Sequence, residues 1–178
     1  ADIDSFDRIQ DSHPLCVVSG GTDLYVQRPA AMAESEPTSL FFDNGLRGVR
    51  DFGHCIEIGA STTVTDLLES PEMWSVFGLN LFKYLSLVSS TPIRNMATLA
   101  GNFVNASPIG DMTVFFLALD AEIDLCTSPH VSKGESRTLA LKDFYLGYKQ
   151  LAKSPEEYIT AIRFKKPTGD FRFSFEKV

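Results

Sequence analysis

The sequence predicts an α+β fold with two lobes, and two observations carry that prediction. Up to about residue 120, short apolar runs typical of strands alternate with segments of helical periodicity. After Asp120 the pattern changes to short apolar and polar alternations with hairpin-like links. Early strand–helix units followed by mostly antiparallel strands are typical of α+β proteins. We expect a small α/β lobe over about residues 1–60 and a larger lobe with an antiparallel sheet over about residues 61–178, within one domain.

The first half of the chain is expected to alternate strands and helices. A polar segment, Asp2–Asp11, reads as the start of a truncated helix. The strands expected next are Leu15–Val18, Leu40–Phe42 and Cys55–Ile58. A short helix interrupted near Pro29 is expected over Asp23–Ala33, and another begins at Thr65–Leu68. Pro71 suits the first turn of a long helix over Glu72–Val88, whose apolar residues recur every three or four positions.

The second half is expected to be mostly strands. Asp111 is a candidate N-cap for a helix that runs through Leu119. One further helix is expected over Leu141–Leu151. The expected strands are Ala121–Cys126, Arg137–Leu141, Tyr158–Phe164 and Phe171–Phe175.

Composition excludes several classes of function. A formal net charge of −7 argues against a nucleic-acid-binding surface, which needs a basic patch. No apolar run reaches the ~18 residues of a membrane span, and no signal-peptide pattern begins at Ala1. The three cysteines, Cys16, Cys55 and Cys126, lack the spacing of zinc or iron–sulfur ligation. We therefore expect buried free thiols, a cytoplasmic protein, no metal site and no catalytic nucleophile–base pair.

A long polar segment, Thr91–Asp111, lies between two strongly apolar stretches. Small residues keep its wall thin, while hydroxyl, amide and carboxylate side chains offer donors and acceptors. Such a composition suits a backbone that wraps closely around a polar, extended ligand. The small residues are Ala97, Ala100, Gly101 and Ala106, and the polar ones are Thr98, Asn102, Asn105, Ser107 and Asp111.

A second segment, Val17–Leu24, reads as a short buried strand that ends in the pair Gly20-Gly21. Two glycines allow unusual backbone angles, and successive N–H groups in such a turn form an anion-binding concavity. Thr22 and Asp23 are candidate caps for the helix that follows. Neither a Gly-x-Gly-x-x-Gly nor a Gly-Lys-Ser/Thr motif is present, which excludes a Rossmann fingerprint and a Walker P-loop. Because the chain is acidic, we expect N–H groups to hold any phosphate.

Together these segments resemble the FAD-binding domain of molybdenum hydroxylases, the xanthine dehydrogenase and carbon monoxide dehydrogenase family, most of all xanthine dehydrogenase. The resemblance covers about Pro14 to Val178. It departs at Ala100, where the family usually has a second glycine; an alanine is tolerated there if the backbone angle is ordinary. The matching residues are Gly20–Leu24, Ile58-Gly59-Ala60 with Thr62-Thr63, Arg94–Asn102 and Ala106–Asp111.

The resemblance implies that FAD is the cofactor and lies between the two lobes. Main-chain donors at Gly20–Asp23 and Thr98–Asn102 would hold its pyrophosphate, and Asp111 would accept from ribose or ribityl hydroxyls, or else cap the following helix. The cofactor-binding residues implied are Val18, Ser19, Gly20, Gly21, Thr22, Asp23, Leu24, Val88, Ala97, Thr98, Gly101, Asn102, Asn105, Pro108, Asp111, Ile159 and Lys177.

For three of the residues in or near these motifs, a structural role competes with contact to the flavin. Val88 either flanks the flavin or packs in the core. Lys177 either stabilises negative charge on the reduced flavin or is a solvated lysine. Arg94 is the basic residue of the long motif, and we expect it to hold the loop through carboxylate or carbonyl bonds.

In the resembled family, electrons leave a substrate at a molybdenum centre, cross iron–sulfur clusters and reach FAD, which passes them to NAD⁺ or another acceptor. This chain would carry the flavin step, with partner domains or subunits holding the other centres. The family continues into a further small α/β domain, which we expect to be missing after Val178. Two alternatives remain: a non-catalytic FAD-binding or assembly module, and a soluble nucleotide-binding protein unrelated to redox chemistry.

Overall fold

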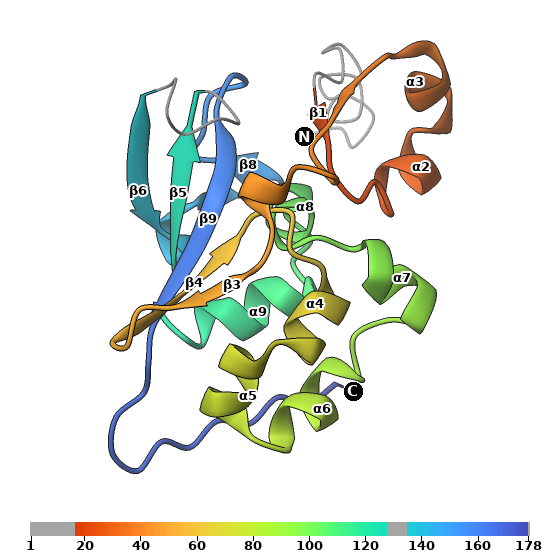
Figure 1. Cartoon of the computed structure of the whole chain (residues 1–178). Coiled ribbons are helices and arrows are strands. Elements are labelled where there is room, and N and C mark those ends of the chain that lie inside the picture. Colours follow the sequence, from red (N-terminus) through yellow and green to blue (C-terminus); the bar gives the residue numbers. More distant parts are fainter. Residues whose placement is uncertain (1–16, 128–134, 178) are drawn as a thin grey trace.

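The structure is a computed structural model that describes residues 17–127 and 135–177. Figure 1 shows a small N-terminal unit lying beside a larger body, in which helices pack under a twisted sheet. The helix expected over Asp2–Asp11 lies outside the described residues.

The small unit is built on a parallel pair of two-residue strands, β1 (Val17–Val18) and β2 (Thr38–Ser39). Between them the expected interrupted helix is confirmed as α2 (Leu24–Gln27) and α3 (Pro29–Glu34). Arg28 takes a non-helical φ of −133° and ψ of 52°, so that Pro29 begins a new helix.

The strand expected over Leu40–Phe42 is wrong. β2 ends at Ser39, and a turn closed by the bond from Asp43 N–H to the Leu40 carbonyl (3.3 Å) leads into the 3₁₀ helix η1 (Asn44–Leu46). The apolar run Leu40–Phe42 suggested a strand, but in the turn Phe41 is buried and Phe42 is exposed.

The larger body contains a five-stranded sheet in the order β3-β4-β9-β5-β6, in which every neighbouring pair is antiparallel. The α+β class is thereby confirmed, and β3 is an addition to the expected strands. Both β3 and β4 precede residue 60 and pair within this sheet, and the boundary between the lobes stays a prediction. The strands are β3 (Val49–Asp51), β4 (Cys55–Gly59), β5 (Glu122–Cys126), β6 (Ser136–Ala140) and β9 (Tyr158–Lys165).

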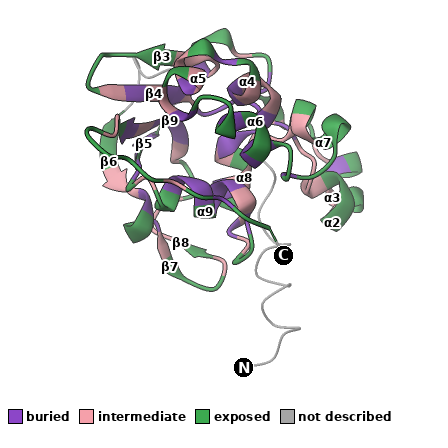
Figure 2. Ribbon diagram, turned by 90° about the horizontal axis from the view of Figure 1, so that it is seen from below, coloured by how far each residue is buried: buried purple, intermediate pink, exposed green. Residues whose placement is uncertain are grey.

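Alternation along the central strands divides the sheet into an apolar and a charged face. Ile58, Ile123 and Ile162 are completely buried against the helices, and Figure 2 shows this buried layer between sheet and helices. On the opposite face Arg163 pairs with Glu57 (2.8 Å) and Asp124 (2.6 Å). Cys126 is a buried free thiol and Cys55 a half-buried one, whereas Cys16 lies outside the described residues.

In the described residues, the helical layer consists of six short helices. The single long helix expected over Glu72–Val88 is wrong, because Gly78 takes a φ of 56° and a ψ of −145° that ends the first helix. A new helix then starts at Asn80. The helices are α4 (Val64–Glu69), α5 (Pro71–Phe77), α6 (Asn80–Leu85), α7 (Thr91–Met96), α8 (Leu99–Asn105) and α9 (Asp111–Leu117).

The helix expected over Leu141–Leu151 is also wrong. A 3₁₀ turn, η3 (Leu141–Asp143), leads into a hairpin of β7 (Tyr145–Gly147) and β8 (Gln150–Leu151). Leu141 and Phe144 are fully buried, so the i, i+3 apolar spacing that favoured a helix is satisfied by one tight turn.

The strand expected over Phe171–Phe175 is replaced by an extended segment without a sheet partner. Its aromatic rings pack onto the helices: Phe173 lies 5.3 Å from the Phe77 ring and 4.9 Å from the Phe115 ring, between centroids. The Tyr84 hydroxyl donates to the Phe173 carbonyl (2.5 Å). The segment therefore contributes rings to the core and crosses under α5 and α6, as Figure 1 shows.

Within the described residues, no helix is long and apolar enough to cross a membrane.

Candidate functional site

The loop from Ser19 to Leu24 connects β1 to α2 and presents its backbone. Gly21 takes a left-handed φ of +66°, which glycine adopts without strain. Within the described part of the chain, the N–H groups of Gly20–Leu24 donate no hydrogen bond, whereas Tyr25 N–H already bonds to the Gly21 carbonyl (3.0 Å). Successive N–H groups without a partner in the described structure are the donors from which anion-binding sites are built.

Asp23 has a different role from the one expected of it. It occupies the N-cap position of α2, but its side chain makes no capping bond to the helix backbone. Its carboxylate instead accepts from the Gln27 side-chain amide at 2.9 Å. The loop N–H groups are thus left uncapped by their own side chains, which keeps them available to a ligand.

Gly20 brings the two polar motifs into contact. A Cβ placed on Gly20 would lie 1.8 Å from the Met96 carbonyl oxygen and 3.4 Å from the Thr98 nitrogen. Real Cβ atoms do not approach a backbone atom that closely, so glycine is required here by space. The first loop is therefore packed directly against the junction between α7 and α8.

The second motif uses its backbone differently from what the sequence indicated. The N–H groups of Leu99 and Ala100 bond to the carbonyls of Thr62 (3.1 Å) and Ala60 (3.0 Å). Those of Gly101 and Asn102 bond to the Thr98 hydroxyl (3.3 Å) and carbonyl (3.0 Å). Of the expected main-chain donors at Thr98–Asn102, those of Leu99–Asn102 are therefore already used by helix and connector, whereas Thr98 N–H donates no bond within the described part of the chain. Ala100, where the family has glycine, has ordinary helical geometry in α8.

Side chains are what this motif presents. The Asn102 side chain lies against α9, where its Oδ1 accepts from Thr113 N–H (3.1 Å). Ala97 and Asn105 are half-buried and Pro108 is exposed. Ala106 ends α8 in the left-handed conformation, with φ of 50° and ψ of 36°, which is rare for a residue other than glycine. The strained residue falls inside the predicted site, where such conformations cluster.

Asp111 and Lys177, two predicted cofactor residues 66 positions apart, meet in the structure. Lys177 Nζ donates to Asp111 Oδ2 at 2.6 Å. The N-cap of α9 is Gly110, and Asp111 is the first helical residue, so the capping alternative for Asp111 is wrong. Lys177 likewise has a partner and is not a freely solvated lysine.

Val88 and Ile159 lie in the hydrophobic core, with 6% and 3% of their surfaces exposed. Core packing thus accounts for both residues, and their contact with the flavin stays a prediction. Arg94 has the structural role expected of it: its guanidinium donates to the carbonyls of Val88 (2.9 Å) and Ser89 (2.8 Å).

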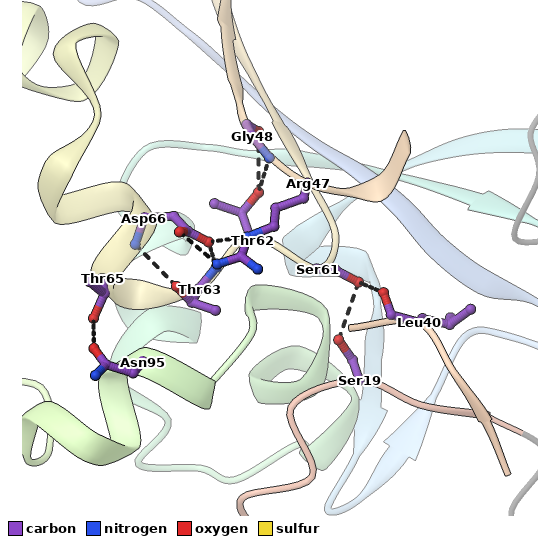
Figure 3. A network of polar contacts seen from close by, with 10 residues as sticks. All are labelled: Ser19, Leu40, Arg47, Gly48, Ser61, Thr62, Thr63, Thr65, Asp66 and Asn95. Atoms are coloured by element: carbon purple, nitrogen blue, oxygen red, sulfur yellow. Dashed lines mark hydrogen bonds and ion pairs between the residues drawn. The ribbon is translucent and has the colours of Figure 1, made fainter. Parts of the chain in front are cut away.

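A buried connector, residues 59–64, bonds to both motifs; Figure 3 shows its contacts with Ser19 and Leu40. The Ser61 hydroxyl is 2% exposed; it donates to the Leu40 carbonyl (2.8 Å) and accepts from the Ser19 hydroxyl (3.2 Å). Thr62 and Ala60 receive the α8 bonds described above. The connector motif is recognisable in the sequence, but its structural role is not, since nothing in a sequence marks a serine as buried.

The connector is anchored at its far end by α4. Thr63 and Asp66 form a reciprocal capping box, and Arg47 donates twice to the Asp66 carboxylate, at 2.8 Å each. Burial alone would raise the pKa of Asp66, but the bonds from Arg47 and Thr63 outweigh it and lower that pKa. Asp66 therefore stays ionised and keeps the start of α4 in place.

The geometry suits FAD. The N–H groups of Gly20–Leu24, unpaired among the described residues, suit an acidic pyrophosphate, and Gly20 lets the loop pack against the α7–α8 junction. Beside it, the seven-residue α8 adds a wall about 10 Å long for an extended ligand. No cluster of three or more His, Cys, Asp or Glu residues that could hold a metal ion occurs among the described residues.

Comparison with known proteins gives the same result. Residues 4–167 match the family model described as "FAD binding domain in molybdopterin dehydrogenase". The carbon monoxide dehydrogenase medium chain of Afipia carboxidovorans is 32% identical over 171 residues, which cover 95% of this chain and 56% of that protein. Xanthine dehydrogenase 2 of Arabidopsis thaliana is 28% identical over 145 residues, covering 77% of this chain and 10% of that protein.

The reconstituted CO dehydrogenase from Oligotropha carboxidovorans has the same fold, with a TM-score of 0.69 at 29% identity, over 85% of this chain and 51% of that chain. The chain thus spans about half the length of the medium chain, and the similarities do not favour xanthine dehydrogenase within the family. With a family model covering most of its length, the chain belongs to the FAD-binding domains of the molybdopterin dehydrogenases.

Proposed function

We propose that this chain carries the flavin step of a molybdenum hydroxylase. The observation that carries the proposal is the row of N–H groups at Gly20–Leu24, which have no partner among residues 17–127 and 135–177. Gly20 packs this row against the second motif. When bound, FAD would supply the redox chemistry, taking electrons from iron–sulfur clusters on partner domains or subunits and passing them to NAD⁺ or another acceptor. The half-buried and buried free thiols suit a cytoplasmic enzyme.

Each group of this chain has a definite task in that proposal. The Gly20–Leu24 N–H groups bind the pyrophosphate, Asn102 and Asp111 orient the cofactor through polar bonds, and the connector keeps the two motifs in register. The proposal leaves the substrate to other parts of the enzyme: the relatives include proteins named for carbon monoxide, xanthine and nicotinate. Xanthine is one candidate among these.

The loop assignment is tested by Gly21→Val. Valine cannot adopt a φ of +66° without strain, so the N–H groups of the loop should turn away from the ligand. A hydrogen bond to a charged group contributes about 1.5–3 kcal/mol, so losing two should weaken FAD binding by roughly 100-fold or more. FAD affinity is measured by flavin fluorescence quenching, and folding by circular dichroism.

Gly53→Val is the matched control. Gly53 also has a left-handed φ, of +83°, but lies in the turn between β3 and β4 with open space around it. It should incur a similar backbone strain and keep its FAD affinity. Equal affinities for the Gly21→Val variant and the wild type would exclude this loop as the phosphate site.

The acceptor is tested separately. Reduction of the bound flavin by NADH would identify NAD⁺ as the acceptor; a flavin that binds but resists NADH would favour another acceptor. The chain by itself should not oxidise purines or aldehydes, because its cysteines lack cluster spacing. Substrate-dependent dye reduction by the pure chain would contradict the proposal.

A further inference from the structure

A residue in the first turn of α9 forms two hydrogen bonds with one side chain of α8. Two donors of Thr113 converge on Asn102 Oδ1: the backbone N–H at 3.1 Å and the side-chain hydroxyl at 3.1 Å. Thr113 is 6% exposed, so both bonds are shielded from competing water. Gly110 gives the pair its space, since a Cβ there would lie 3.1 Å from Thr113 Oγ1 and 3.2 Å from Asn102 Oδ1.

These bonds decide which way round the amide of Asn102 sits. A backbone N–H can only donate, so the atom facing Thr113 must be the amide oxygen. The amide NH₂ group is therefore on the other side of the side chain. Among the described residues it has no hydrogen-bond acceptor, and Asn102 is half-buried. Position 102 thus offers a fixed donor to a ligand.

Tyr145, at the start of β7, lies next to the Thr113 hydroxyl. Its hydroxyl lies 3.4 Å from Thr113 Oγ1 and donates to the Phe103 carbonyl at 3.3 Å. Burial raises the pKa of Tyr145, so the phenol stays neutral. With the phenol proton directed to Phe103, the Thr113 proton remains on the bond to Asn102.

We propose that Thr113 is a positioning residue for the FAD site: its hydroxyl and N–H lock the Asn102 amide so that position 102 presents a donor to a cofactor oxygen. The inference rests on the function proposed above and deepens it. Thr113 itself does not touch the cofactor. Its bonds decide whether the NH₂ group or the oxygen of Asn102 faces the ligand. Without them the amide can rotate and turn its oxygen toward the ligand, where it would repel phosphate or carbonyl oxygens.

Thr113→Val and Thr113→Ser form the matched pair that tests the hydroxyl. Valine keeps the volume and the backbone N–H but loses one of the two bonds, and FAD binding should weaken by about three- to tenfold. Serine keeps the hydroxyl and should stay within about twofold of the wild type. Affinities come from fluorescence quenching, and unfolding midpoints measured without FAD report structural damage. Equal loss of affinity in both variants, or loss in neither, would overturn the inference.

Asn102→Asp tests the ligand-facing NH₂ group of Asn102 separately from the oxygen that faces Thr113. An aspartate oxygen still accepts both Thr113 bonds, so the unfolding midpoint should change little, while the outward donor becomes an anion. FAD affinity should fall by more than about tenfold; unchanged affinity would overturn the proposal. If Thr113→Val does not fold, Thr113→Ala replaces it; it also removes the hydroxyl and keeps the backbone N–H, so a loss of about three- to tenfold is expected, and an unchanged affinity would overturn the proposal.

The two proposals fail in different ways. A wild-type chain that binds no FAD would refute the proposed function, and the lock would fall with it. A wild-type chain that binds FAD, with Thr113→Val and Asn102→Asp binding equally well, would refute the lock alone.

Discussion

The loop at Gly20–Leu24 and the stretch at Thr98–Asn102 share a composition of small and polar residues, yet they present opposite chemistry. In the loop, five successive N–H groups are unpaired among the described residues. In the stretch, every N–H from Leu99 to Asn102 is already bonded to the connector or within α8. The loop thus offers a row of main-chain donors, whereas the stretch offers Thr98 N–H and its side chains.

The contrast explains why both are needed. Unpaired main-chain donors suit a charged pyrophosphate, whose oxygens accept from many directions. A side-chain wall suits hydroxyl and carbonyl groups, which require a donor or an acceptor at a defined place. Both regions contain glycine, but for different reasons. At Gly20 a side chain would collide with the Met96 carbonyl, whereas Gly101 lies within helix α8.

The largest effect is expected from Gly20→Ala, which attacks the contact between the two regions. Its Cβ would lie 1.8 Å from the Met96 carbonyl oxygen, so the loop must move away from the α7–α8 junction. We expect at least about a 100-fold loss of FAD affinity, the equivalent of two bonds to a charged group. Fluorescence titration measures it, with Gly45→Ala as the control, since that Cβ meets only the Asp43 carboxylate, at 3.1 Å. Full affinity in Gly20→Ala would break the comparison.

An intermediate effect is expected from Ser61→Ala, which leaves both regions intact but loosens their separation. The Leu40 carbonyl and the Ser19 hydroxyl each lose a partner in a buried place. Unfolding free energy should fall by about 1–3 kcal/mol, and FAD affinity should fall by several-fold with it. Denaturant unfolding and titration measure the two. Ser75→Ala, an exposed serine that bonds to the Glu72 carbonyl, should change neither. A stable Ser61→Ala with wild-type affinity would show that the connector does not set the separation.

The smallest effect is expected away from both regions, at Glu157. Its hydrogen bond with Arg137, supported by Ser154 N–H, lowers the pKa of this carboxyl from 4.5 to about 2. A lowered folded pKa contributes stability above pH 4.5 that is lost as the pH falls from 4.5 through about 2. Because Arg137 is largely exposed, the contribution is about 1 kcal/mol or less. Glu157→Gln should flatten the acid limb of the stability curve without changing FAD affinity at pH 7; an unaltered limb would refute the ion pair's role.

Much of the fold follows from local sequence signals. The chain is interrupted near Pro29 and starts a helix at Pro71, both as expected, and the apolar alternation of β4, β5 and β9 marks the central strands correctly. Errors arise where a single residue or a missing neighbour decides the outcome. Gly78 ends a helix whose apolar period continues through it, and Phe171–Phe175 has strand alternation but no strand to pair with.

The site was predictable in its motifs but not in its hydrogen bonding. Sequence indicates that Gly20 and Gly21 form a tight loop, and the loop N–H groups agree with that prediction. It cannot show that the amides of Leu99 and Ala100 are taken by the connector, because those acceptors are about 40 residues away (Ala60 and Thr62). Thr113 was missed for the same reason: its partner Asn102 is brought to it by the packing of α8 on α9.

The aromatic segment Phe171–Phe175 combines packed side chains with a backbone that has few hydrogen bonds. Its rings are held by Phe77, Phe115 and Tyr84, but beyond the bonds from Tyr84 to Phe173 and from Phe171 N–H to Gly169, its backbone has little of the ladder that protects a strand. Amide hydrogens here should exchange quickly although the side chains are ordered. Lys177, which pairs with Asp111 at 2.6 Å, follows directly after this segment and Glu176. Local opening of this segment would therefore separate the ion pair without unfolding the sheet.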